Sequence, residues 1–242
     1  MKRKVSYYSL GCKVNLYECN AVINKFIDNG YELVEFNDPE NPSDVVIINT
    51  CTVTQTSDSK SRKIIRQAIN NNKDAIVCVM GCYSQLNPND VCNIEGVGIV
   101  TGTSNRSKIF DLVQTCDLNT KRELINITES YDEINEYEDL HVSRFNDRTR
   151  GFVKVQDGCE NFCSYCAIPF SRGKLRSRNK DEIIKEIQEL TNLGMKEIVL
   201  TGINTGAYGI DKSDYSFPKL LNEICEKVEN LGRIRISSIE AT

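Results

Sequence analysis

Hydrophobic and polar residues alternate along the first half of the chain in a pattern that predicts strands followed by helices. Two continuous apolar runs, residues 44–51 (DVVIINTC) and 75–82 (AIVCVMGC), are typical of strands buried on both faces. Residues 15–29 place apolar side chains at helical spacing, with Asn15 as a candidate N-cap and Gly30 at the end. We therefore expect an α/β fold with an open parallel sheet and helices on both faces.

The same reading predicts the other elements of this half. Strands are expected at residues 4–12, 31–36 and 97–102, and helices at residues 57–71 (capped by Ser57 or Asp58), near 87–94 and at 105–116.

An acidic, polar stretch at residues 123–147 interrupts the pattern, and we interpret it as an exposed linker. A second series of strands and helices follows, with strands at 150–158, 196–202 and 233–240 and helices at 179–193 and 217–230. A complete (β/α) barrel has about eight such units, so these three are expected to begin a partial barrel. The predicted domains are residues 1–122 and 148–242, and because the sequence stops just after a strand we expect a truncated chain.

The composition limits which kinds of metal or catalytic site the chain is expected to contain. The chain has 11 cysteines, one histidine (His141) and a net charge of −4. It has no 18-residue apolar run and no signal-like N-terminus, so no membrane span is implied and a cytoplasmic location is expected. Cytosolic cysteines are more often metal ligands, redox groups or buried hydrophobes than disulfides, and a single histidine argues against histidine-rich zinc sites.

Three cysteines lie close together in residues 157–170 (DGCENFCSYCAIPF), with C-x₃-C-x₂-C spacing. They follow the first strand of the second series, at the edge where parallel α/β folds place their active sites. Soft thiolates suit an iron–sulfur cluster, and three of them would leave one iron with an open position. A zinc knuckle with a distant fourth ligand, or a ferredoxin-type electron carrier, is the alternative. The candidate ligands are Cys159, Cys163 and Cys166.

A second set of cysteines is predicted from position alone. Cys12, Cys51 and Cys82 each stand at the C-terminal end of a predicted parallel strand. Such ends line one edge of a sheet, and Gly11 and Gly81 allow the backbone to turn closely there. We therefore expect a second three-thiolate cluster, against the alternative of three unrelated loop cysteines. The remaining five cysteines are expected to pack in the core.

Six segments, in this order, resemble the radical S-adenosylmethionine (SAM) methylthiotransferase family. They are residues 11–18 (GCKVNLYE), 49–54 (NTCTVT), 81–85 (GCYSQ), 148–173, 200–209 (LTGINTGAYG) and 235–240 (RISSIE). The resemblance implies that Cys159, Cys163 and Cys166 hold a [4Fe–4S] cluster that binds SAM. Reductive cleavage of SAM would then yield methionine and a 5′-deoxyadenosyl radical.

The resemblance also implies an auxiliary [4Fe–4S] cluster on the first set, Cys12, Cys51 and Cys82, which carries the sulfur or methylthio group. Further SAM contacts are expected from Tyr165 and from the loop TGINTG, through Gly202, Asn204 and Gly206. A plain strand-to-helix turn is the alternative for that loop.

Within the family, GCKVN and NTCTVT resemble the branch that adds a methylthio group to C2 of N6-threonylcarbamoyladenosine at position 37 of tRNA. The isopentenyladenosine branch is more similar to GCQMN and NTCSVR, and the ribosomal-protein branch to GCPKN. The chain departs from the family at Ala241, where proline is common, and it lacks the rest of the radical domain and the C-terminal TRAM domain.

Expected partners are the tRNA anticodon loop, an electron donor and a sulfur donor. A basic run around the cysteine triplet would suit RNA phosphates, although such runs are often only solvated faces: Arg144, Arg148, Arg150, Arg172, Lys174, Arg176 and Arg178. The alternatives are a methylthiotransferase that acts on another tRNA adenosine or on a ribosomal protein, and a non-catalytic iron–sulfur or zinc module.

Overall fold

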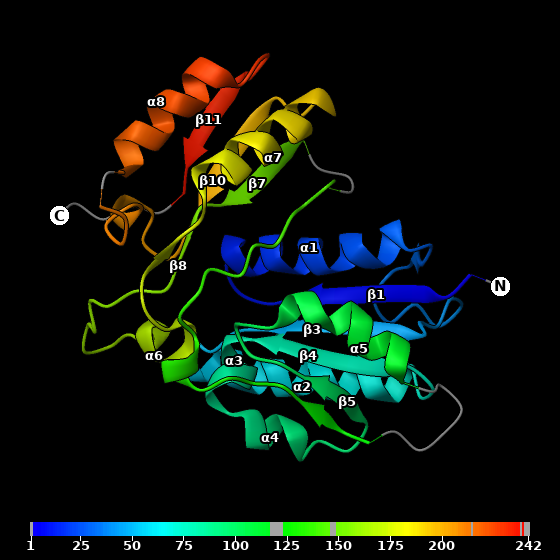
Figure 1. Ribbon diagram of the computed structural model, residues 1–242. Coiled ribbons are helices and arrows are strands. Elements are labelled where there is room, and N and C mark those ends of the chain that lie inside the picture. Colours follow the sequence, from blue (N-terminus) through cyan, green and yellow to red (C-terminus); the bar gives the residue numbers. More distant parts are fainter. Residues whose placement is uncertain (1, 117–122, 146–148, 214, 238, 240–242) are drawn as a thin grey trace.

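The computed structural model of the protein describes residues 2–116, 123–145, 149–213, 215–237 and 239. Two parallel sheets organise it, a larger one in the first half and a smaller one in the second (Figure 1). None of the described helices is long and apolar enough to cross a lipid bilayer.

The first sheet has six parallel strands in the order β2-β1-β3-β4-β5-β6. They are β1 (Lys4–Ser9), β2 (Glu32–Leu33), β3 (Val45–Thr50), β4 (Ile76–Gly81), β5 (Val97–Val100) and β6 (Ile125–Asn126). The two continuous apolar runs form the central strands β3 and β4, in which every residue is buried. The expected parallel sheet is thus confirmed.

Helices cover both faces of this sheet because alternate residues of β3 point into different cores. Val45 and Ile47 pack with α1 (Lys13–Asp28) and α5 (Ile109–Thr115), which follows the short turn η1 (Arg106–Lys108). Val46 and Ile48 pack on the opposite face, with α2 (Gln55–Asn71), α3 (Cys82–Leu86) and α4 (Pro88–Cys92). Figure 1 shows α1 and α5 on one side of the sheet and α2 and α4 on the other.

The second sheet consists of β7 (Arg150–Lys154), β10 (Glu197–Thr201) and β11 (Arg233–Ile236), paired in parallel with β10 in the middle. Its helices α7 (Lys180–Asn192) and α8 (Phe217–Lys227) pack on it through one apolar core. This core also takes in Tyr17 and Ala21 of α1, so α1 lies between the two sheets (Figure 1).

Shorter elements frame the cysteine-rich loop of the second sheet. The predicted strand at 150–158 is divided, because β8 (Gln156–Asp157) leaves the sheet to pair antiparallel with β9 (Arg176–Ser177). Between them lies the short helix α6 (Ile168–Arg172), and η3 (Thr205–Ala207) follows β10.

Three predicted boundaries were wrong. Helix α1 begins at Lys13, with Cys12 rather than Asn15 at its N-cap. Helix α2 is capped by Thr54, whose side chain accepts from the Ser57 backbone N–H at 3.1 Å. The strand expected at 31–36 is only two residues long.

The stretch interpreted as an exposed linker is mostly exposed or half-buried in its described part, 123–145, but it is anchored at four points. After β6 and the turn η2 (Tyr131–Glu133), the chain runs across α1. Its apolar residues Ile134, Leu140, Val142 and Phe145 are buried, and the Tyr17 hydroxyl of α1 donates to the Leu140 carbonyl. The acidic composition of the stretch did not predict these four buried residues.

Candidate functional site

The first-domain cysteines lie at neighbouring strand ends. Cys12, Cys51 and Cys82 directly follow, within three residues, the adjacent strands β1, β3 and β4. The register pairs Ser9 with Asn49 and Thr50 with Gly81. The three cysteines therefore emerge at the same level on one edge of the sheet, as position alone predicted.

Two glycines make this close approach possible. Gly11 has φ +101°, and a Cβ there would lie 3.0 Å from both Cβ and Sγ of Cys51. Gly81 has φ +105°, and a Cβ there would lie 2.2 Å from Asn49 Oδ1 and 2.5 Å from the Thr50 carbonyl oxygen. Any larger residue would push the strand ends apart.

Cys82 has the most unusual surroundings of the three. It is buried at the start of α3, and burial raises the pKa of its thiol, while hydrogen bonding and the charge of Arg172 act in the opposite direction. Cys12 is exposed, and its thiol approaches Asn15 Oδ1 at 3.6 Å. Cys51 is buried.

The second-domain triplet lies in the loop between β8 and α6. Two backbone contacts fold this loop: the Cys159 N–H donates to the Gly173 carbonyl at 3.1 Å, and the Cys166 N–H donates to the Cys163 carbonyl at 2.9 Å. Cys163 is exposed, and Cys159 and Cys166 are half-buried. The loop thus holds its three thiols at the surface, at the C-terminal side of β7.

One cavity joins the two cysteine sets. It has a volume of about 290 Å³ and lies between the strand ends of the first sheet and the triplet loop. Its lining includes four of the six predicted ligands, Cys82, Cys159, Cys163 and Cys166, together with Thr52, Val53, Asn161, Tyr165, Ala167, Ile168, Ser171, Ile203 and Asn204.

The predicted SAM contacts divide between cavity wall and loop. Tyr165 and Asn204 line the cavity, whereas Gly202 and Gly206 stand beside it in the same loop as Asn204. The Asn204 backbone N–H donates to Gln156 Oε1 at 2.8 Å, which fixes the loop. Its side-chain Oδ1 is buried without a hydrogen-bond partner in the described structure, so a polar acceptor is available at the cavity.

The cysteines are gathered in one region without forming a ligand cage. Within the described residues, no three Cys, His, Asp or Glu side chains are arranged to hold one metal ion. All 11 cysteines lie in the described part of the chain, and none of them forms a disulfide there.

The basic run near the triplet does not form the expected phosphate-binding surface. Arg172, Arg176 and Arg178 are buried, and each pairs with a buried carboxylate, Glu18, Asp157 or Glu186. Arg144 and Arg150 are exposed but paired with Asp28 and Glu197, while Lys174 is exposed. Arg148 lies outside the described residues. Periodicity could not reveal this burial, because the carboxylate partners come from distant segments.

The feature that sequence reasoning missed is a buried cluster of charges between the domains. It joins Glu18 of α1 to side chains of the second half and of η1: Arg106, Lys154, Asp157 and Arg172. A signal was present, because Glu18 stands between Tyr17 and Cys19 on a largely buried helix, and Lys154 interrupts an apolar strand. Buried charges of this kind require partners.

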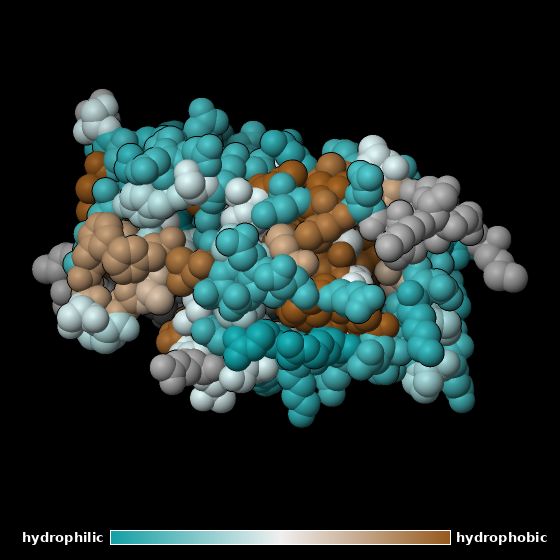
Figure 2. All heavy atoms as spheres, turned by 90° about the horizontal axis from the view of Figure 1, so that it is seen from below, coloured by the Kyte–Doolittle hydropathy of each residue, from teal (hydrophilic) through white to brown (hydrophobic). Residues whose placement is uncertain are grey.

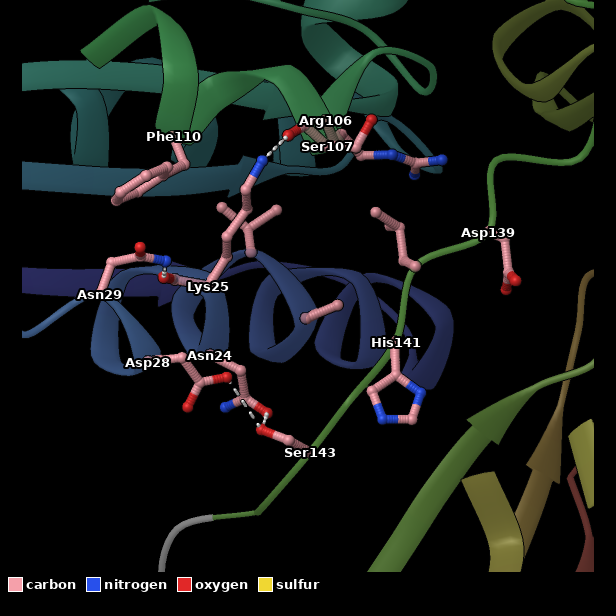
Figure 3. Close-up of a pocket in the computed structure, with 13 residues that line it drawn as sticks. Asn24, Lys25, Asp28, Asn29, Arg106, Ser107, Phe110, Asp139, His141 and Ser143 are labelled. Atoms are coloured by element: carbon pink, nitrogen blue, oxygen red, sulfur yellow. Dashed lines mark hydrogen bonds between the residues drawn. The ribbon is translucent and has the colours of Figure 1, made fainter. Parts of the chain in front are cut away.

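A second cavity, of about 310 Å³, lies along α1 where the segment 139–143 crosses it (Figure 3). The Lys25 ammonium there donates to the Ser107 carbonyl at 3.0 Å, and Ser143 donates to Asn24 at 3.1 Å. No cysteine lines it, so it is a seam between packed segments rather than part of the cysteine site.

Exposed apolar side chains occur at the cysteine cavity, which Val53 lines, and in the segments next to its lining residues. Val53, Phe162 and Phe170 are each about half exposed or more, at 61%, 49% and 57%, and the two phenylalanine rings meet edge to face at 5.6 Å. Figure 2 shows mildly hydrophobic surface at the left end of the molecule, the end at which Figure 1 places α6. Exposed aromatic surface beside a cavity is typical of a binding site.

Two family models match separate parts of the chain. Residues 4–102 match the family described as Uncharacterized protein family UPF0004, and residues 153–241 match the Radical SAM superfamily. A solved structure of the radical SAM methyltransferase TsrM from Kitasatospora setae is similar in fold, with TM-score 0.62 and 17% identity. That match covers 93% of this chain and 53% of that one.

Curated relatives are closer in sequence. The Threonylcarbamoyladenosine tRNA methylthiotransferase MtaB of Bacillus subtilis (strain 168) is 49% identical, and that of Aquifex aeolicus (strain VF5) is 38% identical, each over 98% of this chain. The tRNA-2-methylthio-N(6)-dimethylallyladenosine synthase of Fervidobacterium nodosum is 32% identical over 96%.

The matches cover 52%, 56% and 51% of those three relatives, so the chain spans about half their length. A UPF0004 match and a Radical SAM match occur together in this chain. With the relatives above, they confirm the resemblance carried by the motifs. Over almost its whole length, the chain is therefore similar in sequence to radical SAM methylthiotransferases.

Proposed function

We propose that the cavity between the two cysteine sets is the active site of a radical SAM methylthiotransferase with two [4Fe–4S] clusters. Cys159, Cys163 and Cys166 would hold the cluster that binds SAM, and Cys12, Cys51 and Cys82 the auxiliary cluster. The observation that carries the proposal is that Cys82, from the first domain, lines the same cavity as the whole second-domain triplet.

The side chains around the cavity suit these groups. Thiols are the donors that iron–sulfur clusters prefer, and each domain supplies three of them. Three thiolates leave one iron of a cubane without a protein ligand, which a substrate or cofactor can then occupy. The unpaired Asn204 Oδ1 offers an acceptor to a donor group of SAM, such as its ammonium.

When bound and reduced, the SAM-binding cluster would supply the radical chemistry, and SAM would supply both methyl group and radical. The chain's own residues would position and enclose these groups. Gly11 and Gly81 bring the first-domain thiols together, the Gln156–Asn204 hydrogen bond fixes the loop opposite the triplet, and Tyr165 borders the cavity.

The substrate proposed is N6-threonylcarbamoyladenosine at position 37 of tRNA, modified at C2. Two observations support this choice over other adenosines. One is the pair of motifs GCKVN and NTCTVT, and the other is the identity of 49% and 38% to the Bacillus and Aquifex relatives named for that nucleoside, against 32% to the Fervidobacterium relative named for dimethylallyladenosine. An electron donor and a sulfur donor would be further partners. Exposed Phe162 and Phe170 could stack on bases of the unpaired anticodon loop.

Nucleoside mass spectrometry of tRNA tests the substrate. A strain lacking the gene should lose 2-methylthio-N6-threonylcarbamoyladenosine and accumulate the unmodified nucleoside, and the gene should restore it. Unchanged levels of that nucleoside would refute the assignment. Loss of a different methylthioadenosine would instead favour another tRNA substrate, and intact tRNA with an unmodified ribosomal protein would favour the protein substrate.

A further inference from the structure

Arg172 stands at the junction of the two cysteine sets. It is the last residue of α6, the helix that follows the triplet loop, yet its side chain is buried against the first domain. Its Nη2 donates to Asn15 Oδ1 at 2.7 Å, and its Nη1 donates to Glu18 Oε1 at 2.7 Å. The same Nη1 reaches Asp157, two residues before Cys159, at 3.1 Å.

The guanidinium also lies close to the first-domain cysteines. Helix α6, which ends at Arg172, packs against α3, which begins at Cys82. Through Asn15 it is one contact away from Cys12, whose thiol lies 3.6 Å from the same Oδ1 atom. Arg172 is thus linked to the predicted auxiliary ligand Cys12 through Asn15. Through Asp157 it also contacts the segment that carries Cys159, two residues further along the chain.

Charges in this buried cluster do not balance. Its carboxylates are Glu18, Asp157 and Glu138, and its cations are Arg106, Lys154, Arg172 and Arg176. Four cations face three anions, so one positive charge is in excess among the described groups. Figure 3 shows the Arg106 side chain extending away from Lys25, and its guanidinium pairs with Glu18 of this cluster.

An unbalanced buried cation is costly unless an anion compensates it. A cluster held by three thiolates is such an anion, and two of its predicted ligands are close to Arg172: Cys12 through Asn15, and Cys82 through the contact of α3 with α6. Resting on the proposed function, we propose that Arg172 is a positioning residue that compensates the charge of the auxiliary cluster and, with Glu18, sets its reduction potential.

The effect follows from electrostatics. Reduction adds negative charge to a cluster, and a fixed cation nearby in a buried site stabilises the reduced form. Loss of the Arg172 charge should therefore move the potential in the negative direction. Loss of the Glu18 charge should move it in the positive direction, because the excess of cations grows.

The test measures the midpoint potential of the auxiliary cluster by electron paramagnetic resonance at poised potentials. The parent protein carries Cys159→Ala, Cys163→Ala and Cys166→Ala, so that only the first-domain cluster contributes to the signal after anaerobic reconstitution. Arg172→Gln should shift the potential negatively, Glu18→Gln positively, and Arg172→Lys, which keeps the charge, should stay near the parent.

Arg178→Gln is the matched control. Arg178 is an equally buried arginine in the same interdomain seam, but its partners are Tyr17, Asp139 and Glu186 rather than Asn15, which contacts Cys12. It should lower stability without moving the potential. If Arg172→Gln does not fold, Glu18→Gln decides alone, because it leaves Arg172 in place.

The outcomes separate the two proposals. A parent that binds no first-domain cluster overturns the two-cluster function and this inference with it. A parent that binds the cluster, with potentials that do not shift in Arg172→Gln and Glu18→Gln or shift equally in Arg178→Gln, overturns the inference alone.

Discussion

Each set of cysteines has its own environment, and the difference predicts different roles. Two of the three first-domain cysteines, Cys51 and Cys82, are buried at strand ends and Cys12 is exposed, whereas none of the triplet in the surface loop is fully buried. A buried site fixes its ligands by the surrounding packing, while a surface loop can admit an external molecule to the metal.

Single cysteine substitutions test this division. Cys159→Ala should abolish release of 5′-deoxyadenosine from SAM, because it removes a ligand of the SAM-binding cluster. Cys51→Ala should leave that release in place and stop methylthio transfer. Chromatographic measurement of deoxyadenosine distinguishes them, and equal loss in both variants would contradict the division.

Gly81 gives a second prediction at this scale. Gly81→Ala adds a Cβ within 2.5 Å of backbone at positive φ, so it should destabilise the protein by about 2–3 kcal/mol or more. The control is Gly30→Ala, which has φ +89° but nothing within 4 Å of the new Cβ, and should cost about 1–2 kcal/mol. Urea unfolding measures both, and equal losses would show that crowding at the strand ends is unimportant.

At the scale of elements, the helix caps show what local sequence determines. Asn179, predicted near the start of α7, is its N-cap, and its side chain accepts from the Asp181 backbone N–H at 2.8 Å. Ser216 occupies the same position on α8 but makes no capping hydrogen bond from its side chain. The same residue class therefore contributes differently in the two helices.

Asn179→Ala should accordingly reduce the free energy of unfolding by about 1 kcal/mol, whereas Ser216→Ala should have a smaller effect. Thermal or urea unfolding of the two variants provides the comparison. A larger loss for Ser216→Ala would mean that α8 rather than α7 depends on its cap.

Elements with strong local patterns were predictable, and those that depend on distant partners were not. The apolar runs identified β3 and β4, and the alternation of strands and helices predicted the parallel sheet, although not the order of its strands. Helix α3 and the division of β7 from β8 went unpredicted, because both follow from pairing between segments far apart, such as β8 with β9. Asn15 looked like a cap, yet its amide instead donates to the carbonyls of Leu10 and Thr50 at 2.8 and 3.0 Å.

The site shows the same limit. The triplet was visible as a motif, and the first-domain set was predictable because parallel strands end at one edge. The buried charges were not, since Glu18 meets Lys154 and Arg172 only when α1 is packed against the second domain. From the sequence alone, the arginines were therefore interpreted as a basic surface.

At the scale of the whole molecule, these buried charges join the two domains and make stability depend on pH. The cations around Glu18 outweigh the effect of burial and hold the pKa of its carboxyl far below the usual range, and Asp157 behaves likewise. The unfolded chain therefore binds more protons than the folded one below about pH 4.5. The stabilisation is complete above that pH and is lost as the pH falls.

Urea unfolding of the cluster-free protein between pH 6 and pH 3 tests this sign. The free energy of unfolding should fall steeply below about pH 4.5, and Glu18→Gln should flatten the fall while lowering stability at pH 6. Glu226→Gln, at an exposed position of α8, should leave the profile unchanged. Stability that rises on acidification would contradict the predicted direction.

The central claim is that two three-cysteine sets, one in each domain, each hold a cluster beside the shared cavity. Iron and sulfide analysis after anaerobic reconstitution tests it most directly. The account predicts about eight irons and eight sulfides per chain, and about four of each when either set is changed to alanine. About four irons in the unsubstituted protein, all lost with Cys159, Cys163 and Cys166, would contradict the auxiliary cluster, and zinc alone would contradict the enzyme.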